Sequence, residues 1–101
     1  MLNDIYYTYV LFSEKDKNFY VGYTHNVALR FEQHCGGQVD STKNRRPLLL
    51  IYFEGGLDKQ DALNREKYLK TFYGRMFLGK RLKSYFTRLH NETSHNNPEN
   101  R

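Results

Sequence analysis

Hydrophobic and polar positions alternate in short blocks along this chain of 101 residues. Two aromatic and β-branched segments, residues 5–12 (IYYTYVLF) and 19–23 (FYVGY), are separated by the polar residues 13–18. This composition is typical of strands, and the polar connection predicts an antiparallel hairpin. Gly22 predicts a bulge or a close backbone approach in the second strand. A third strand is expected at residues 48–54, which are apolar on both faces and therefore predict a central or well-covered position.

The first helix is predicted directly after the hairpin. Thr24 and Asn26 can each cap a helix that runs through residues 27–34. Gly36 and Gly37 then end it, because glycine readily adopts the positive φ of a helix C-terminus.

Two more helices are expected after the third strand. Asp58 and Asp61 predict the start of a helix over about residues 59–72. Gly74 interrupts, and residues 75–86 predict the next helix. The order ββαβαα predicts an α+β fold in which helices pack on a small sheet.

The length of the chain fits one small domain, expected over residues 1–89. Residues 90–101 are polar throughout and predict a disordered C-terminal tail. The single cysteine, Cys35, excludes an intramolecular disulfide and fits a reducing compartment. No apolar run approaches the roughly 18 residues of a membrane span. Residues 1–4 lack the basic and apolar parts of a signal peptide, so a cytoplasmic location without membrane contact is expected.

Glu66 is the acidic side chain whose position is hardest to explain by packing. It follows Ala62 by four residues and precedes Leu69 by three, so it lies on the helix face directed at the sheet. A carboxylate there is costly unless it is paired or coordinated. Glu66 is therefore a partner for an arginine, a residue at the exposed margin of the apolar stripe, or a ligand of a divalent metal ion.

Arg30 and His34 project from one face of the first predicted helix, along the edge of its buried stripe. Such residues are usually solvated. Phosphoryl transfer, however, needs a cation for the developing charge, a positioned base for water, and a metal or acid for the leaving oxygen, so Arg30 and His34 become candidates together with Glu66 and the tyrosines. Tyr9 and Tyr20 lie on adjacent predicted strands, where tyrosine mostly packs. A phenol is a poor base unless a nearby cation lowers its pKa.

Basic residues outnumber acidic ones, 16 to 11, which favours an anionic partner. Eight basic residues and only one acidic residue lie between positions 65 and 88. This excess is either a solvated face or a footprint for a nucleic-acid backbone. The candidate contacts are Lys43, Arg45, Arg46, Arg65, Lys67, Lys70, Arg75, Lys80 and Arg81. No base-reading motif is present, so little sequence specificity is expected.

Several of these segments, taken in order, resemble the small stand-alone members of the GIY-YIG nuclease superfamily. Tyr7-Thr8-Tyr9 stands where the family has Gly-Ile-Tyr, and Tyr20-Val21-Gly22 is close to Tyr-Ile-Gly. The segments Tyr20–Thr24, Lys43–Pro47 and Arg65–Lys70 continue the resemblance, which covers about residues 5–83.

The resemblance implies a three-stranded antiparallel sheet flanked by helices, and metal-dependent hydrolysis of DNA, with repair or recombination as the setting. It implies that Tyr9 or Tyr20 orients or deprotonates the attacking water. Arg30 would steady the phosphate, and His34 matches a histidine that some members use. Glu66 would anchor the single Mg²⁺ or Mn²⁺ ion.

Three positions depart from the family pattern: Tyr7 replaces glycine, Tyr23 stands where some members have lysine, and Phe77-Leu78-Gly79 stands where some have asparagine. The last two leave open a catalytically weak or inactive nucleic-acid-binding module on the same scaffold. A domain whose basic face binds an acidic protein is a third alternative.

Overall fold

The computed structural model describes residues 4–95. Its elements follow in the order β1 (Tyr6–Ser13), β2 (Phe19–Thr24), α1 (Val27–Cys35), a 3₁₀ turn (Lys43–Arg45), β3 (Leu48–Gly56), α2 (Lys59–Leu69), α3 (Phe72–Arg81) and α4 (Lys83–His95). The chain divides between Tyr68 and Leu69 into two compact units.

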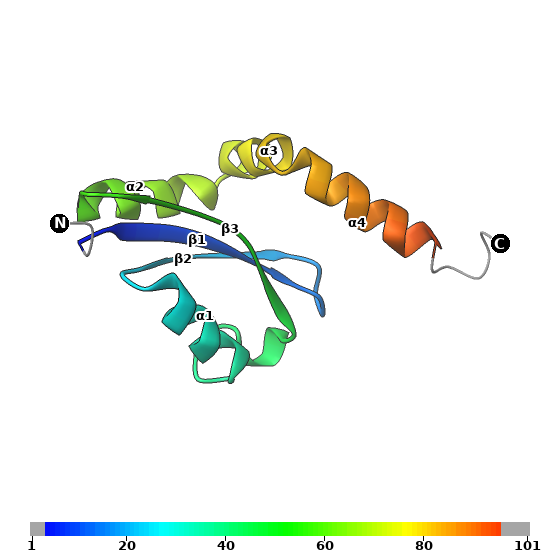
Figure 1. Cartoon of the computed structure of the whole chain (residues 1–101), viewed down its shortest axis with the longest axis horizontal. Helices are drawn as coiled ribbons and strands as arrows, with labels where there is room; N and C mark the ends of the chain where they lie inside the picture. The colour runs from blue at the N-terminus through cyan, green and yellow to red at the C-terminus, as the bar shows by residue number, and fades with distance from the viewer. Residues whose placement is uncertain (1–3, 96–101) are drawn as a thin grey trace. The chain divides into compact units, whose positions relative to one another are not determined.

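The first unit is built on an antiparallel sheet with the strand order β2-β1-β3. Helices α1 and α2 lie on opposite sides of this sheet (Figure 1). The predicted α+β fold, with three antiparallel strands flanked by helices, is therefore confirmed.

The central strand is β1, and the prediction of a central position for β3 is wrong. Tyr9, Val10 and Leu11 on β1 are buried, whereas most of β3 is half-buried or exposed. Within the described residues β3 pairs along one side only, with β1. An apolar run predicts that the faces of a strand are covered, but it does not show how many strands pair with it. The other alternative, a well-covered strand, holds only at Leu48, because the residues after it are half-buried or exposed.

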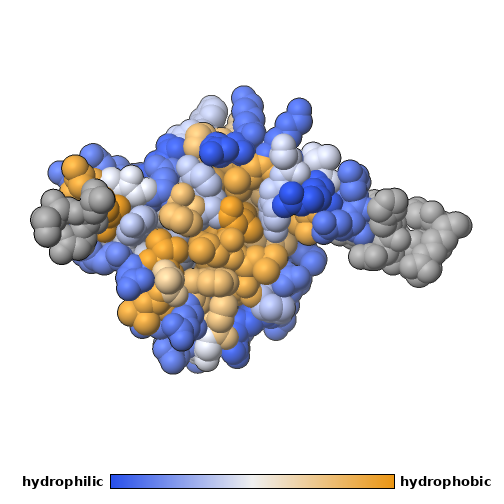
Figure 2. Space-filling view, viewed as in Figure 1, coloured by the Kyte–Doolittle hydropathy of each residue, from blue (hydrophilic) through white to orange (hydrophobic). Residues whose placement is uncertain are grey.

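One core cluster of the first unit lies between the sheet and α1. Tyr9, Leu11 and Leu48 are its buried members, and Tyr20, Phe31 and Leu50 pack around them. The space-filling view shows hydrophobic residues gathered in the middle of the visible face, over the sheet (Figure 2). Aromatic rings make up half of the residues of this core, which is how a short chain buries a large apolar area.

Helix α1 begins and ends where the capping residues predict. Asn26 is the N-cap, and its side chain accepts a hydrogen bond from the backbone N–H of Leu29 at 3.1 Å. Gly36 occupies the C-cap, and Gly37 follows it with a φ of 77°. An L-residue at that φ is strained, so the second glycine is the one that lets the chain leave the helix.

The second unit contains α3 and α4, where a single helix over residues 75–86 was predicted. Thr71 caps α3 by accepting a hydrogen bond from Gly74 N–H at 3.1 Å, so Gly74 lies inside the first turn. The expected interruption at Gly74 is therefore wrong. Helix α2 ends at Leu69, earlier than predicted, and the break between α3 and α4 falls at Leu82.

Helix α4 continues to His95 and so includes residues 90–95 of the predicted tail. Residues 96–101 lie outside the described part of the chain, and the domain boundary at residue 89 stays a prediction. Among residues 4–95, no helix combines the length and the apolar character needed to cross a bilayer.

Candidate active site

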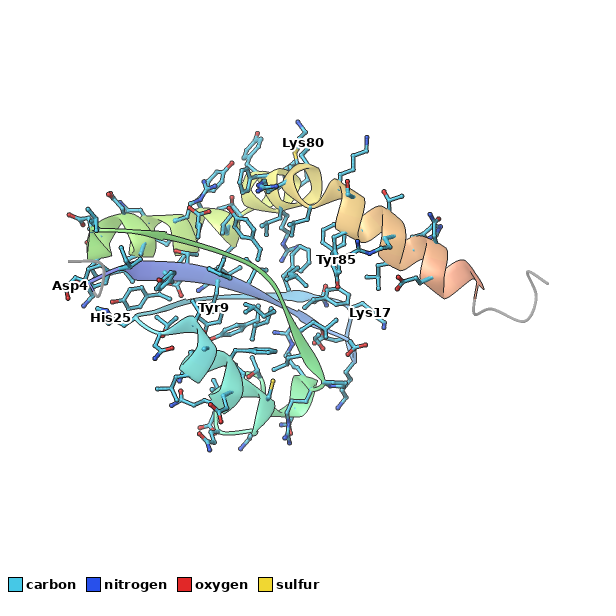
Figure 3. All side chains as sticks on the ribbon, viewed as in Figure 1. Asp4, Tyr9, Lys17, His25, Lys80 and Tyr85 are labelled. Carbon is cyan, nitrogen blue, oxygen red and sulfur yellow. The ribbon has the colours of Figure 1, made fainter. Side chains whose placement is uncertain are left out.

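Tyr9 is the centre of the candidate site. It lies on the central strand β1 and is 1% exposed. Its hydroxyl is 2.8 Å from Nε2 of His34 on α1, and the side chain lies between β1 and α1 (Figure 3). The Tyr20 ring, from β2, is 6.4 Å from the Tyr9 ring and 5.1 Å from the His34 ring. Three predicted site residues from three elements therefore meet in one cluster.

Gly22 makes room for the Tyr9 ring. The two residues are partners in the β1–β2 ladder, which keeps its register from Tyr7 to Phe12. A Cβ atom on Gly22 would overlap the Tyr9 hydroxyl and lie 2.8 Å from Tyr9 Cε1. The glycine thus marks a close approach, one of the two alternatives predicted, and the β1–β2 ladder contains no bulge there.

His34 is fully buried, which corrects its predicted position at the edge of the helix stripe. Its Nδ1 is 2.7 Å from Oγ1 of Thr42, which is also fully buried. Every buried side-chain N and O atom in residues 4–95 has a hydrogen-bond partner. His34 is buried because both ring nitrogens are satisfied, which removes the cost of taking a polar ring out of water.

Thr42 was missed by the sequence reasoning. It stands at the N-cap of the 3₁₀ turn, but its hydroxyl makes no capping bond and bonds to His34 instead. Threonine in a polar loop has no periodicity that could reveal such a partner. The sequence contains no signal that could have found it.

Burial sets the charge state of the Tyr9–His34 pair. It raises the pKa of Tyr9 to about 12, partly offset by the neighbouring Arg30 side chain, while Tyr20 and Glu66 raise it further. Burial, and then the positive charge of Arg30, lowers the pKa of His34 to about 4. Both side chains are therefore neutral at pH 7. A neutral imidazole has one donor and one acceptor nitrogen, and the hydroxyls of Thr42 and Tyr9 can satisfy either tautomer.

Arg30 on α1 and Glu66 on α2 are the charged candidates. The Arg30 side chain lowers the pKa of Tyr9, whereas Glu66 is the smallest of the influences that raise it. Both side chains are half-buried, and Arg30 Nη1 donates a hydrogen bond to Gln33 Oε1 at 3.0 Å. Three of the five predicted catalytic residues, Tyr9, Tyr20 and His34, therefore contact one another with Arg30 beside them, and the catalytic role of Glu66 stays a prediction.

Helix α2, which carries Glu66, is attached to the central strand by a buried hydrogen bond. The Thr8 hydroxyl on β1 donates to the carbonyl oxygen of Ala62 at 2.8 Å. Ala62 precedes Glu66 by four residues, or about one helical turn. This bond fixes where along β1 the carboxylate stands.

Tyr20 differs from Tyr9 in its access to the surface. It lies on the edge strand β2 and is half-buried. Its hydroxyl accepts a hydrogen bond from the exposed Ser41 at 3.5 Å, near the upper limit for such a bond. Tyr20 is thus the motif tyrosine whose hydroxyl lies next to an exposed side chain.

A divalent ion would find one carboxylate in this cluster. Among the described residues, no group of three or more His, Cys, Asp and Glu side chains is placed to hold a metal. Glu66 provides the hard oxygen ligand that Mg²⁺ and Mn²⁺ prefer, and such ions often use one or two carboxylates with water and phosphate. The donor set therefore fits a single hard cation.

Two of the predicted DNA contacts are held by other protein groups. Arg45 pairs with Asp16 and also donates to the carbonyl oxygens of Asn18 and Phe19, both at 3.3 Å. This contact lowers the pKa of Asp16 to about 2. Arg65 donates to Glu54 at 2.9 Å. These bonds tie loops and strands of the first unit together.

The other basic candidates are exposed. In the first unit they are Lys43, Arg46 and Lys67; in the second they are Lys70, Arg75, Lys80 and Arg81. Lys43 lies 3.4 Å from the exposed Asp40, and Arg46 donates to the Lys43 carbonyl oxygen at 3.0 Å. An exposed pair of this kind is weak and leaves the charge available to a polyanion.

A comparison with known families identifies the family of this chain. The family model described as the GIY-YIG catalytic domain matches residues 5–81. The chain belongs to the GIY-YIG family. A nuclease-type function follows from that membership, and the resemblance seen in the motifs is confirmed.

The chain is also similar to several UPF0213 proteins. A UPF0213 protein of Limosilactobacillus reuteri (strain DSM 20016) is 44% identical over 73 residues, covering 69% of this chain and 75% of its own. UPF0213 protein SH2523 of Staphylococcus haemolyticus (strain JCSC1435) is 41% identical over 68 residues, covering 66% and 82%. The solution NMR structure of UPF0213 protein BH0048 from Bacillus halodurans is 29% identical, covers 84% of each chain, and has a TM-score of 0.41.

Proposed function

We propose that this GIY-YIG protein is a metal-dependent DNA endonuclease that hydrolyses phosphodiester bonds. The observation that carries the proposal is the contact of the half-buried Tyr20 with the Tyr9–His34 pair, next to the cationic Arg30. Phosphodiester hydrolysis needs a cation at the phosphate, an oriented water and a stabilised leaving oxygen. The cluster contains a side chain suited to each of the first two, and a ligand for the ion that supplies the third.

Arg30 binds the scissile phosphate in this proposal. Its planar guanidinium can grip two phosphate oxygens at once. It is half-buried, so it reaches the surface while remaining close to Tyr9. Glu66 holds the Mg²⁺ or Mn²⁺ ion, which when bound polarises the phosphate and stabilises the leaving oxygen.

Tyr20, rather than Tyr9, orients or deprotonates the attacking water. Tyr9 is 1% exposed and its pKa is raised to about 12, so it is badly placed to meet substrate and a poor base. Tyr9 and His34 instead act as positioning residues, since their bond fixes the two rings against which Tyr20 packs.

DNA is held through its backbone by the exposed basic residues in this proposal. Lys43, Arg46 and Lys67 in the first unit supply sequence-independent contacts. Arg45 and Arg65 are assigned to structure because each guanidinium already pairs with a carboxylate, that of Asp16 or Glu54. The basic residues of α3, in the second unit, supply backbone contacts of the same kind.

The proposal is tested by incubating the chain with nicked, flapped and branched DNA and Mn²⁺, and comparing the wild type with Glu66→Ala. Loss of the metal ligand removes several kcal/mol of transition-state stabilisation, so cleavage should fall at least about 1000-fold. The fold should persist, as measured by circular dichroism. Asp61→Ala is the matched control, because Asp61 is an exposed acid on the same helix and should retain full activity.

Full cleavage by Glu66→Ala would remove the proposed mechanism. A preference for branched or flapped DNA over intact duplex would support a role in repair or recombination.

A second candidate function is DNA binding without efficient cleavage. Tyr23 and the Phe77-Leu78-Gly79 segment, which replace the lysine and asparagine of some family members, favour it. Its signature is binding that weakens steeply with salt, together with no cleavage in any divalent metal.

A further inference from the structure

A surface groove of about 400 Å³ lies beside the candidate active site. It is lined by residues of the β2–α1 connection and of α1, and Arg30 belongs both to this groove and to the cluster around Tyr9. A volume of this size can hold a small aromatic molecule. Whatever occupies the groove therefore lies next to the group proposed to bind phosphate.

The lining of the groove contains the aromatic rings of Tyr23 and His25, which both contact the ring of Tyr6. The Tyr23 and His25 rings are 6.0 Å apart, and their side chains are hydrogen-bonded at 3.4 Å. Tyr6 on β1 stacks on Tyr23 with ring centres 6.3 Å apart and planes 12° apart, and lies 4.5 Å from the His25 ring. His25, labelled in Figure 3, is nevertheless exposed. The rings thus form a supported surface that still faces solvent.

An exposed apolar side chain and two cations lie in or beside the groove. Leu29, on the first turn of α1, is 51% exposed although its side chain is apolar. Lys59 Nζ lies 6.0 Å from the centre of the Tyr23 ring, and Arg30 contributes a second cation. Aromatic rings set among cations are the arrangement with which proteins bind single-stranded nucleic acid, the rings stacking on bases and the cations on phosphates.

We propose that this groove is a nucleobase-stacking subsite. An unpaired base of the DNA strand stacks on the Tyr23–His25 surface while the adjacent phosphate binds Arg30. The inference rests on the proposed function and names its substrate class. A base within a duplex has both faces covered by its neighbours, so the subsite selects DNA with unpaired nucleotides beside the scissile bond.

The test measures binding without divalent metal, so that it does not depend on cleavage. The probe is a single-stranded oligonucleotide containing 2-aminopurine, whose fluorescence is quenched when the base stacks, and the same strand in a duplex. The variant is Tyr23→Leu, which keeps apolar bulk but removes the ring. Affinity for the single strand should fall about 5- to 100-fold, and the quenching should be lost.

Two control variants and a second test variant, His25→Ala, separate stacking from loss of structure. Tyr23→Phe keeps the ring and should bind like the wild type. Tyr73→Leu removes an exposed tyrosine of α3 and should also leave the quenching unchanged. His25→Ala removes an exposed ring, so the protein should fold as the wild type does while binding the single strand several-fold more weakly. The salt dependence of binding should be the same in all of them, because none changes a phosphate contact.

The subsite is excluded if Tyr23→Leu and His25→Ala both bind and quench as the wild type does, if duplex binding falls by the same factor, or if the wild type produces no quenching. Quenching without any cleavage in Mn²⁺ would leave the subsite standing and overturn the endonuclease. Cleavage together with unchanged quenching in Tyr23→Leu would support the endonuclease and overturn the subsite.

Discussion

The two motif tyrosines occupy contrasting places in the same cluster. Tyr9 lies on the central strand, almost without exposure, and bonds to a buried histidine that bonds to a buried threonine. Tyr20 lies on the edge strand, half-buried, with its hydroxyl next to an exposed serine. Arg30 and Glu66 share the half-buried condition of Tyr20. The cluster therefore has an interior part and a part that reaches the surface.

This difference separates two kinds of contribution to one reaction. The part that reaches the surface, here called the open side, consists of Tyr20, Arg30 and Glu66. These residues can contact substrate, and their loss should reduce the rate while leaving the fold intact. The interior part, here called the closed side, consists of Tyr9, His34 and Thr42, which can act only by holding their neighbours, so their loss should reduce stability as well. The following variants test that division.

Arg30→Ala should produce the largest effect among residues other than Glu66. Removing a cation from the developing phosphate charge costs about 2–4 kcal/mol, or roughly 30- to 1000-fold in kcat/KM. The thermal midpoint should change little. Arg45→Ala is the matched control, since Arg45 ties the β1–β2 loop to the 3₁₀ turn and should lower stability with little effect on the rate. Equal rate losses in the two variants would contradict the division.

Acid should destabilise the closed side through His34. Its pKa is about 6.5 in the unfolded chain and about 4 in the fold, so the unfolded state binds the proton more tightly. The contribution is complete above pH 6.5 and is lost as the pH falls towards 4, by up to about 3 kcal/mol. Urea unfolding at pH 7.5, 5.5 and 4.5 should show this loss.

The same series in two variants assigns the acid effect. His34→Gln should flatten the pH dependence, whereas His25→Gln, at an exposed position, should retain it. Asp16 cannot produce the effect, because its contribution to stability is lost only below its ordinary pKa of 3.8, as the pH falls towards 2.

Gly22→Ala should disturb the closed side and the open side of the cluster at once. The added Cβ would overlap the Tyr9 ring, and forcing extra volume into a packed core costs about 1–3 kcal/mol. The displaced ring would also move away from His34. Gly56→Ala is the control, because a Cβ there meets no atom within 4 Å. Urea denaturation of the two variants should differ, and equal stability would show that the ring moves aside freely.

Thr42→Val should have the smallest effect of these variants, and that effect should be mainly on the free energy of unfolding. It preserves shape but leaves Nδ1 of the buried His34 without a partner, which costs about 1–3 kcal/mol. Thr42→Ser retains the hydroxyl and should restore most of the loss. If the valine and serine variants are equally stable, the hydrogen bond does not stabilise the closed side.

The sequence predicted the helices, the strands and the grouping of site residues better than it predicted how deeply each side chain is buried. Asn26 and the glycine pair located α1, and Gly22 indicated the close approach at Tyr9. The helix pattern around Glu66 pointed to an unusual carboxylate. Each of these signals is local, because spacing along one element determines which side chains share a face.

Burial and partner choice depended on contacts between elements. His34 was expected at the edge of a stripe, but a threonine eight residues away completes its hydrogen bonds and allows full burial. Arg45 was expected to bind DNA, yet a distant aspartate and two carbonyl oxygens take up its guanidinium. The apolar run in β3 similarly could not reveal that only one strand pairs with it among the described residues.

The hydrogen bond from Thr8 to Ala62 has a consequence for which changes of length the chain can accept. Thr8 and Tyr9 are consecutive residues, one attached to α2 and the other to His34 on α1. Inserting one residue between them would turn both side chains to the same face of the strand, so one of the two attachments would be lost. The spacing of Thr8 and Tyr9 therefore cannot change if α1 and α2 are to stay attached to opposite faces of the sheet.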